Sequence, residues 1–348
     1  MSAEIKIFFE IAEKIFSKKI DHTVRINNSY DNRKFVELLN ELKKSELTKI
    51  LMKEEFGGAN LCLGEIVPLI KLSSKYGLPL PFSETIIANY ILSELNVKPL
   101  NDFSTLCYET SNITIVDNKV SGVFKSVPYL NLTNFILAKI NFNNHHHLIY
   151  FENKSGKLTQ LKNFLAEPRF DLKIENEELI YFLDLPYMIN FENLISNIKS
   201  IQSVGAMEKI LELCIKYCSD RKQFGRSLSK FQMIQNHISE IALETAASGA
   251  SIAIFQNQSK NKELNENFFD LKNTAIAKIR TGLASGKIIA ASHQAHGAMG
   301  FTKEYELSYF SKNLNSWRND FGNETYWQNI LGEMFLKQNK GMWEFLNQ

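Results

Sequence analysis

The hydrophobic pattern of this chain changes its period twice, and this change constrains the fold more than any other feature of the sequence. Up to about residue 100, apolar residues recur at helical spacing, as in the stretch Phe35–Leu42, and glycines and prolines mark the turns. Between about residues 102 and 178, short β-branched and aromatic runs replace that spacing. Helical spacing returns after Asn193. We therefore expect a mainly α protein with a small central β domain.

Three runs in the central region have the composition of strands. They are Asn112–Val116, Phe135–Ala138 and His147–Phe151, separated by Asp, Asn and Gly turn signals. A chain of 348 residues is long enough for two or three domains. We predict an N-terminal helical domain over residues 1–100, a β-barrel-like middle domain over 101–188 and a C-terminal four-helix bundle over 189–348.

The bundle is predicted from four stretches of helical spacing. The first ends at Gly225, and Ser229 is the expected N-cap of the second. A polar break over Ser259–Asn267 precedes a third helix, from about Phe268 to Gln294, whose many small residues favour close helix approach. The turn Gly297–Gly300 leads into the fourth.

Charge and cysteine content exclude several classes of protein. Forty basic and 38 acidic residues leave a net charge of +2, which offers no electrostatic footprint for nucleic acid. The four cysteines include no CxxC pair, so we expect a reducing, cytoplasmic setting. No run of 18 or more apolar residues occurs, and we expect no membrane insertion. His145–His147 fits a solvated hairpin better than a metal site, so we expect no metal.

One stretch carries the residue types that a dinucleotide needs. It is Tyr217–Leu228, followed by Phe231 and Gln232. Arg221 offers a planar fork of donors for a diphosphate, Phe224 an aromatic face and Gly225 a close backbone approach, while Gln223 and Gln232 supply amides. By itself, Arg221 is better explained as an arginine that stabilises the C-terminus of a helix.

A second stretch, Gln294–Thr302, combines a glutamine with a glycine-rich turn. Taken alone it is compatible with a simple cap and turn between helices. Two further stretches, Glu54–Ala59 with Gly77–Ala88, and Val120–Asn134, complete a collinear set that spans nearly the whole chain.

In this order and spacing, the four stretches resemble the acyl-CoA dehydrogenase superfamily. Tyr217–Gln232 is similar to its Arg-x-x-Phe-Gly turn with a following Phe-Gln, and Gln294–Phe301 to its Gln-x-x-Gly-Gly-x-Gly turn, with Ala298 in place of the second glycine. An alanine is tolerable there if its φ angle is negative. The resemblance implies that both turns contact FAD held mainly by a neighbouring subunit. The residues it assigns to FAD are Arg221, Gln223, Phe224, Gly225, Leu228, Gln232, Gln294, His296, Gly297 and Ala298.

The resemblance also implies an activity. The family removes hydrogen across the α,β bond of an acyl-CoA thioester: a carboxylate takes the α-proton and the flavin accepts the β-hydride. We therefore expect an FAD-dependent oxidoreductase of fatty acid or acyl-CoA degradation that works as an oligomer on an acyl-CoA substrate.

The catalytic base is not identified by the sequence. The family's glutamate before a glycine falls at Phe321, before Gly322. The other family position, on the first bundle helix, falls near Ile195, with Glu192 nearly one turn away and Ser196 where many members have an arginine. Nearby carboxylates are Asp320 and Glu324.

These departures, together with the missing Trp-Ser/Thr flavin segment of the middle domain, resemble the short, base-deficient subunits of heteromeric bacterial members. Three hypotheses stay open: a catalytic subunit in a homo-oligomer or in a heterotetramer with a longer chain, a structural subunit that cradles FAD for a base-bearing homologue, and a flavin oxidase or monooxygenase on the same scaffold.

Overall fold

The computed structural model describes residues 3–27, 29–161, 166–185, 190–258, 270–338 and 341–346. The chain forms two compact units. Unit 1 comprises Met1–Leu69 and Tyr76–Phe191, and unit 2 comprises Ile70–Lys75 and Glu192–Gln348.

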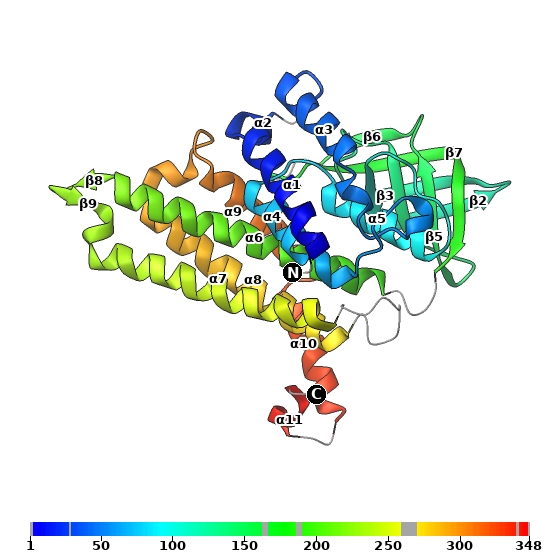
Figure 1. Ribbon diagram of the computed structural model, residues 1–348. Helices are drawn as coiled ribbons and strands as arrows, with labels where there is room; N and C mark the ends of the chain where they lie inside the picture. Colours follow the sequence, from blue (N-terminus) through cyan, green and yellow to red (C-terminus); the bar gives the residue numbers. More distant parts are fainter. Residues whose placement is uncertain are drawn as a thin grey trace. The chain divides into compact units, whose positions relative to one another are not determined.

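Side chains satisfy the free N–H groups at the start of two N-terminal helices. The helices of this part of the chain are α1 (Ala3–Lys19), α2 (His22–Ile26), α3 (Arg33–Ser45), α4 (Val67–Tyr76, of which Ile70–Lys75 belong to unit 2) and α5 (Phe82–Glu94) (Figure 1). Asp21 accepts from Val24 N at 2.9 Å to cap α2, and Asn32 accepts from Lys34 N at 3.1 Å to cap α3. Residues Phe82–Ser93 of α5 are all buried, so this helix forms the interior of the unit.

The sheet of unit 1 has seven strands. They are β1 (Ser104–Cys107), β2 (Glu109–Val116), β3 (Lys119–Pro128), β4 (Phe135–Phe142), β5 (His145–Glu152), β6 (Lys157–Gln160) and β7 (Arg169–Asp184). Their order is β1-β4-β5-β7-β3-β2, with β6 also on β7, and all pairs are antiparallel except β1 with β4. The end of β7 pairs with β5 and its beginning with β3 and β6, so this strand joins both halves of a curled sheet. The three strands predicted from composition all lie within observed strands.

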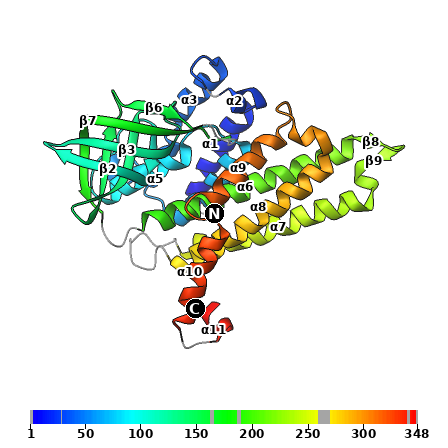
Figure 2. The ribbon, with the colours of Figure 1, turned by 180° about the vertical axis from the view of Figure 1, so that it is seen from behind.

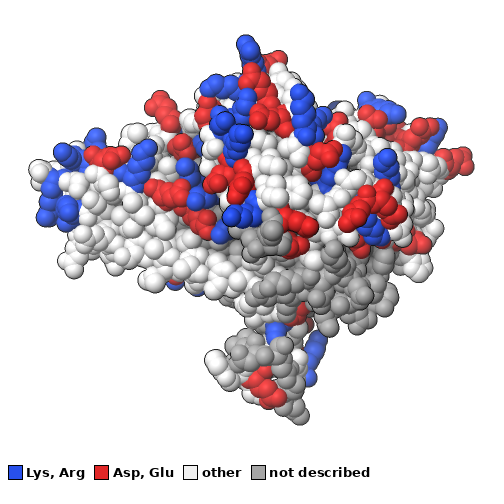
Figure 3. All heavy atoms as spheres, viewed as in Figure 1, with Lys and Arg blue, Asp and Glu red and all other residues white. Residues whose placement is uncertain are grey.

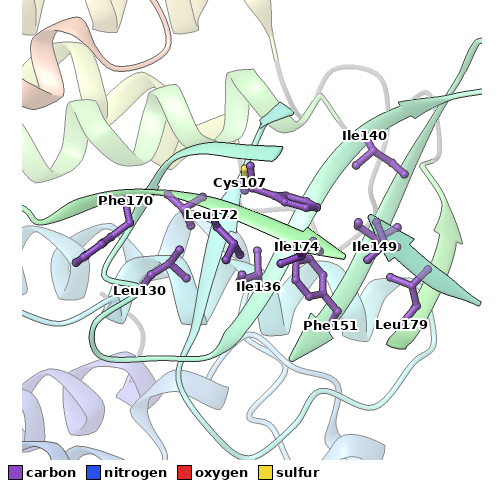
Figure 4. Packing of buried hydrophobic residues seen from close by; sticks show 14 residues of the cluster. Cys107, Leu130, Ile136, Ile140, Ile149, Phe151, Phe170, Leu172, Ile174 and Leu179 are labelled. Atoms are coloured by element: carbon purple, nitrogen blue, oxygen red, sulfur yellow. The ribbon is translucent and has the colours of Figure 1, made fainter. Parts of the chain in front are cut away.

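The inner face of the sheet holds the core of the β region (Figure 4). Alternate residues of the central strands point into it, as expected for strands with one buried face. Phe124 of β3 and Phe151 of β5 meet there with ring centroids 5.1 Å apart. The buried hydroxyl of Thr85 in α5 donates to Ser104 O of β1 at 3.0 Å, which ties the helices of the unit to its sheet.

Unit 2 is helical. Its helices are α6 (Phe191–Asp220, whose first residue belongs to unit 1), α7 (Gln232–Gln258), α8 (Leu271–His296), α9 (Leu307–Asn319), α10 (Glu324–Leu336) and α11 (Met342–Leu346). Figures 1 and 2 show α6, α7 and α8 running side by side. Residues Ile70–Lys75 of α4 join this unit because they pack on α6, where Gly205 approaches Lys71 O closely and Lys71 pairs with Glu208 at 2.8 Å. The predicted helical bundle is confirmed.

Two predicted boundaries of the bundle were wrong. The first helix ends at Asp220 rather than at Gly225, because the next residues form a β-hairpin, β8 (Lys222–Gln223) with β9 (Arg226–Ser227). Ser229 is not the N-cap of the second helix, because Leu228–Lys230 form a 3-10 turn and α7 begins at Gln232. Asp270 caps α8, and the polar break predicted over Ser259–Asn267 lies outside the described residues.

The division into three domains stays a prediction. The secondary structure changes from helix to strand between Glu94 and Ser104, and back to helix between Asp184 and Phe191, near the predicted boundaries. The N-terminal helices and the sheet nevertheless belong to one compact unit.

Candidate cofactor site

The hairpin after α6 presents an aromatic side chain in a strained backbone conformation. Phe224 and Gly225 have φ angles of +53° and +78°, as a two-residue hairpin turn requires at both positions. Glycine adopts this conformation freely, whereas phenylalanine does so at a cost. Phe224 is 90% exposed, and its ring makes a T-shaped contact with Phe231 at 6.1 Å between centroids, so burial within the described chain offsets little of that cost. A strained, exposed aromatic at a hairpin tip is typical of a binding element.

Cations surround this tip. Arg221, Lys222 and Arg226 are exposed, and Figure 3 shows Lys and Arg side chains gathered at this end of the bundle. The Arg226 guanidinium lies over the Phe231 ring at 4.2 Å from its centroid. Within the described residues, no ion pair or side-chain hydrogen bond engages the Arg221 guanidinium. Its fork of donors is therefore available to a ligand.

The turn after α8 exposes its backbone. Gly297 has φ +59° and ψ −143°, a conformation that only glycine adopts readily. Gln294, Gly297 and Ala298 are exposed. A Cβ placed on Gly297 or on Gly225 would meet no described atom within 4 Å, so the space above both glycines is open. The φ angle of Ala298 is not positive. An alanine can therefore stand where the family usually has a glycine.

The two turns lie at the same end of the bundle (Figures 1 and 2). Tyr217, one helical turn before Arg221, stacks on His296 with ring centroids 4.4 Å apart. Its hydroxyl also donates to His296 O at 3.3 Å. This contact joins the end of α6 to the end of α8 and brings Arg221 and Gly297 into one region.

The predicted FAD residues do not all face outward. Gln223 and Gln232 are exposed and Leu228 is half-buried. His296 differs, because its side chain is only 3% exposed and lies against Tyr217 and Tyr305. Its backbone is the part that borders the exposed turn. A direct side-chain contact of His296 with a cofactor is therefore not favoured.

These residues fit one half of a flavin nucleotide. A diphosphate is matched by a free guanidinium and a locally positive surface, and a flat ring system by an exposed aromatic side chain. The open backbone at Gly225 and Gly297 permits the close approach that such a ligand needs.

The family position of the base is occupied by a residue that cannot accept a proton. Phe321 and Gly322 form a turn with φ angles of +59° and +99° after α9. Glu324, three residues later, is 8% exposed, and its carboxylate pairs with the Arg318 guanidinium. Gly282 of α8 makes room for this carboxylate, since a Cβ there would lie 2.5 Å from Glu324 Oε1. Glu324 is thus held in an internal ion pair.

The second family position of the base is also apolar. Ile195 is 3% exposed and Ser196 is fully buried, both within α6. Asp320 ends α9, and its backbone oxygen accepts from Lys278 Nζ at 2.7 Å. Burial lowers the pKa of Lys278 to about 8, against a smaller opposing effect from Asp320 and Glu324.

Sequence reasoning missed Lys278 and Tyr305, and it gave no role to Tyr217, at which the first motif begins. Lys278 lies in the middle of α8, where its spacing resembles that of any helix residue, so no local signal marks it as buried. The two tyrosines flank the predicted turns, and this adjacency was the available signal.

Comparison with known proteins finds a family match within unit 2. Residues 199–332 match the family "Acyl-CoA dehydrogenase, C-terminal domain". Over 107 residues, 31% of this chain, the sequence is 33% identical to glutaryl-CoA dehydrogenase from Desulfococcus multivorans. The matches to three curated relatives span 26% to 48% of each relative's length.

Solved structures extend the similarity to the whole fold. Butyryl-CoA dehydrogenase from Megasphaera elsdenii superposes with a TM-score of 0.79 at 15% identity, covering 97% of this chain and 99% of the other. The ChsE4-ChsE5 complex from Mycobacterium tuberculosis gives 0.79 at 12% identity, covering 98% and 99%. At such identities the likeness shows the fold alone. Residues 199–332 therefore belong to the acyl-CoA dehydrogenase C-terminal domain family, and the chain as a whole has the fold of acyl-CoA dehydrogenases.

Proposed function

We propose that this chain is a subunit of an oligomeric, FAD-dependent acyl-CoA dehydrogenase that removes hydrogen across the α,β bond of an acyl-CoA thioester. In this proposal the hairpin of Lys222–Ser227 and the Gly297–Gly300 turn form half of an FAD site that a neighbouring subunit completes. The observation that carries it is the Arg221 guanidinium, exposed and unengaged within the described chain, at the end of the bundle where the Gly297 backbone is open.

An uncharged stripe on α7 supports assembly through the bundle. Among the described side chains of this helix, the exposed ones fall in groups spaced three or four positions apart and include no charged residue: Gln232, Met233, Gln235, Asn236, Ser239, Leu243, Ala246, Ala247, Ala250 and Ile254. Figure 3 shows this side of the bundle nearly free of charged side chains. Leu243 is 71% exposed and Met233 is 66% exposed. Such a face is typical of a helix that packs on a partner.

By length and composition, Gln232–Gln256 is also apolar enough to cross a membrane. Its only acidic residues, Glu240 and Glu244, argue for a bundle helix, because Glu244 forms ion pairs with Arg280 and Lys287 of α8. A charged cluster of this kind is costly in lipid. We propose a protein partner for this face and a cytoplasmic location for the assembly.

The partner that best fits the residues is a longer acyl-CoA dehydrogenase-like chain in a heterotetramer. Phe321 removes the carboxylate at the main family position of the base, and Glu324 is held by Arg318. A base-bearing partner would supply the missing proton acceptor. A homo-oligomer is the simpler assembly, and it requires a base from within this chain.

The exposed Arg221 guanidinium is also compatible with a second function. In it the chain performs no chemistry and only cradles the FAD of the base-bearing partner. In either case bound FAD supplies the hydride acceptor, a role that no side chain can fill. The residues of this chain would hold the diphosphate through Arg221 and exclude water at the Gly297 turn.

The deciding experiment compares the chain alone with the chain co-expressed with an acyl-CoA dehydrogenase that carries the glutamate. Flavin absorbance is recorded, and saturated acyl-CoAs of several lengths are added without oxygen. Bleaching only in the mixture supports the paired subunit, and bleaching by the chain alone shows a base within it. Oxygen consumption without another acceptor would favour an oxidase, and the absence of flavin from both preparations would contradict the proposal.

A further inference from the structure

Three side chains form an aromatic cluster directly below the exposed Gly297 backbone. The Tyr217 ring stacks on the His296 imidazole, with planes 24° apart. The Tyr305 ring lies 5.1 Å from the imidazole and 5.8 Å from the Tyr217 ring. We call Tyr217, His296 and Tyr305 the clasp.

Hydrogen bonds define the protonation of the clasp. His296 Nδ1 lies 2.8 Å from Ser292 O, and Nε2 lies 3.1 Å from the Tyr305 hydroxyl. A carbonyl oxygen only accepts, so Nδ1 carries the proton. Nε2 is then free to accept from Tyr305. The imidazole in this arrangement is neutral.

The clasp is the short connection between the two turns. Arg221 N donates to Tyr217 O at 2.9 Å, which places the Arg221 backbone one helical turn beyond Tyr217. His296 immediately precedes Gly297, and its backbone oxygen accepts from the Tyr217 hydroxyl. The imidazole therefore links the end of α6, which leads to Arg221, to the backbone that precedes Gly297.

On the basis of the proposed function, we infer that His296 is a positioning residue that sets the spacing of the two turns so that both engage one FAD. The imidazole itself stays away from the cofactor, because it is buried. Its influence on FAD passes through Tyr217 to Arg221 and through its own backbone to Gly297.

The groups around the clasp are neutral near pH 7 or paired. On α6, Cys214 Sγ lies 3.9 Å from His296 Nδ1, and burial raises the pKa of Cys214 to about 12 and raises that of Cys218 as well. Burial also raises the pKa of Tyr305 to about 12 and lowers the pKa of His293 on α8. Glu306, next to Tyr305, lies 4.0 Å from Lys209 Nζ.

This setting predicts a pH dependence of FAD binding. Burial lowers the pKa of His296 below its ordinary 6.5, because the charged form loses solvation. The clasp is therefore intact above that pH. As the pH falls, a proton on Nε2 removes the acceptor of Tyr305, so the spacing is lost and FAD is held less tightly.

The test uses the wild-type oligomer purified from cells and stripped of flavin. FAD is titrated between about pH 5 and pH 8 by flavin fluorescence. His296→Asn keeps an amide donor for Ser292 O but lacks Nε2 and the ring. We expect this variant to bind FAD about tenfold more weakly at pH 8, because it loses roughly one hydrogen bond and one stacked contact. It should also lose the pH dependence of the wild type.

Two variants separate positioning from general damage. Tyr217→Phe keeps the stacked ring and removes only the bond to His296 O, so it should weaken FAD binding in the same direction by a smaller factor. Tyr181→Phe is the control, because it removes a single tyrosine bond to the backbone, to Lys98 O at 2.9 Å, in unit 1. Unfolding temperatures of all variants report folding independently.

The outcomes distinguish this inference from the function on which it rests. If Arg221→Ala leaves FAD affinity unchanged, the proposed function fails. If Arg221→Ala weakens binding while folded His296→Asn retains both the affinity and the pH dependence of the wild type, the inference about His296 alone is overturned. Loss of the pH dependence in His296→Asn supports it, since a residue needed only for stability would leave the pH profile intact.

Discussion

Arg221 directly precedes the hairpin and Arg226 lies on it, and yet the two side chains have different roles. Arg226 stacks on Phe231 and stabilises the hairpin itself, whereas the guanidinium of Arg221 is exposed and engaged by no described side chain. An exposed guanidinium that pairs with no described side chain is a candidate for ligand binding. This contrast is visible only at the scale of single residues.

Arg221→Ala should lower the affinity for FAD by about 10- to 100-fold, because a charged hydrogen bond contributes about 1.5–3 kcal/mol. Flavin content after gel filtration measures the loss. Lys230→Ala, an exposed cation three residues beyond the hairpin, is the matched control and should leave flavin content unchanged. Equal losses in both variants would point to overall charge rather than to the guanidinium.

Phe321→Glu tests the missing base. The position is a turn with positive φ before Gly322, and the family places its glutamate there. We expect the variant to bleach bound flavin on addition of acyl-CoA at least 100-fold faster than the wild-type chain, the usual order of magnitude for a positioned general base. Asp320→Glu, one residue earlier, is the control. An inert Phe321→Glu variant that still binds FAD would contradict the assignment of this position.

At the scale of elements, the end of α9 depends on a buried lysine. Lys278 Nζ donates to Trp317 O at 2.9 Å and to Asp320 O at 2.7 Å, so an ammonium from α8 satisfies the free carbonyls of another helix. This arrangement positions the Phe321–Gly322 turn. Burial of the Lys278 ammonium opposes folding at neutral pH, because it lowers the pKa of Lys278 from 10.5 to about 8.

The sign of the resulting pH effect follows from proton binding. Between about pH 8 and pH 10.5 the unfolded chain keeps the proton on Lys278 and the folded chain releases it, so this residue's contribution to stability becomes more favourable as the pH rises. The difference in unfolding free energy between wild type and Lys278→Met should change by up to about 3 kcal/mol over that range. Chemical denaturation at several pH values measures it. A difference that is constant with pH would show that Lys278 has its ordinary pKa.

At the scale of the whole molecule, the α7 stripe supports the proposal that the chain works in an oligomer. Leu243 is 71% exposed in the middle of the stripe. Leu243→Glu should dissociate the oligomer and release FAD, because a charge in a buried interface loses its solvation. Sedimentation measures the mass. Val116→Glu in unit 1 is a matched control at 66% exposure and should change neither mass nor flavin content.

Much of the fold was predictable because it depends on local patterns. Three strands of the sheet, β2, β4 and β5, were located from β-branched and aromatic runs, and the bundle from apolar spacing. The boundaries near Ser229 were wrong, since a 3-10 turn and a two-residue hairpin have no distinctive composition. Both turns of the candidate site were recognised from motifs whose residues are contiguous in the sequence.

The sequence alone determined which residues carry donors, rings and open backbone at the two turns, because these are properties of residue type and local conformation. Only the tertiary structure decided that Arg221 is unengaged, that His296 is buried beneath Tyr217 and that Arg318 holds Glu324. Tyr217 and His296 are 79 positions apart. Burial and pairing depend on contacts between residues so distant in sequence, which no local pattern encodes.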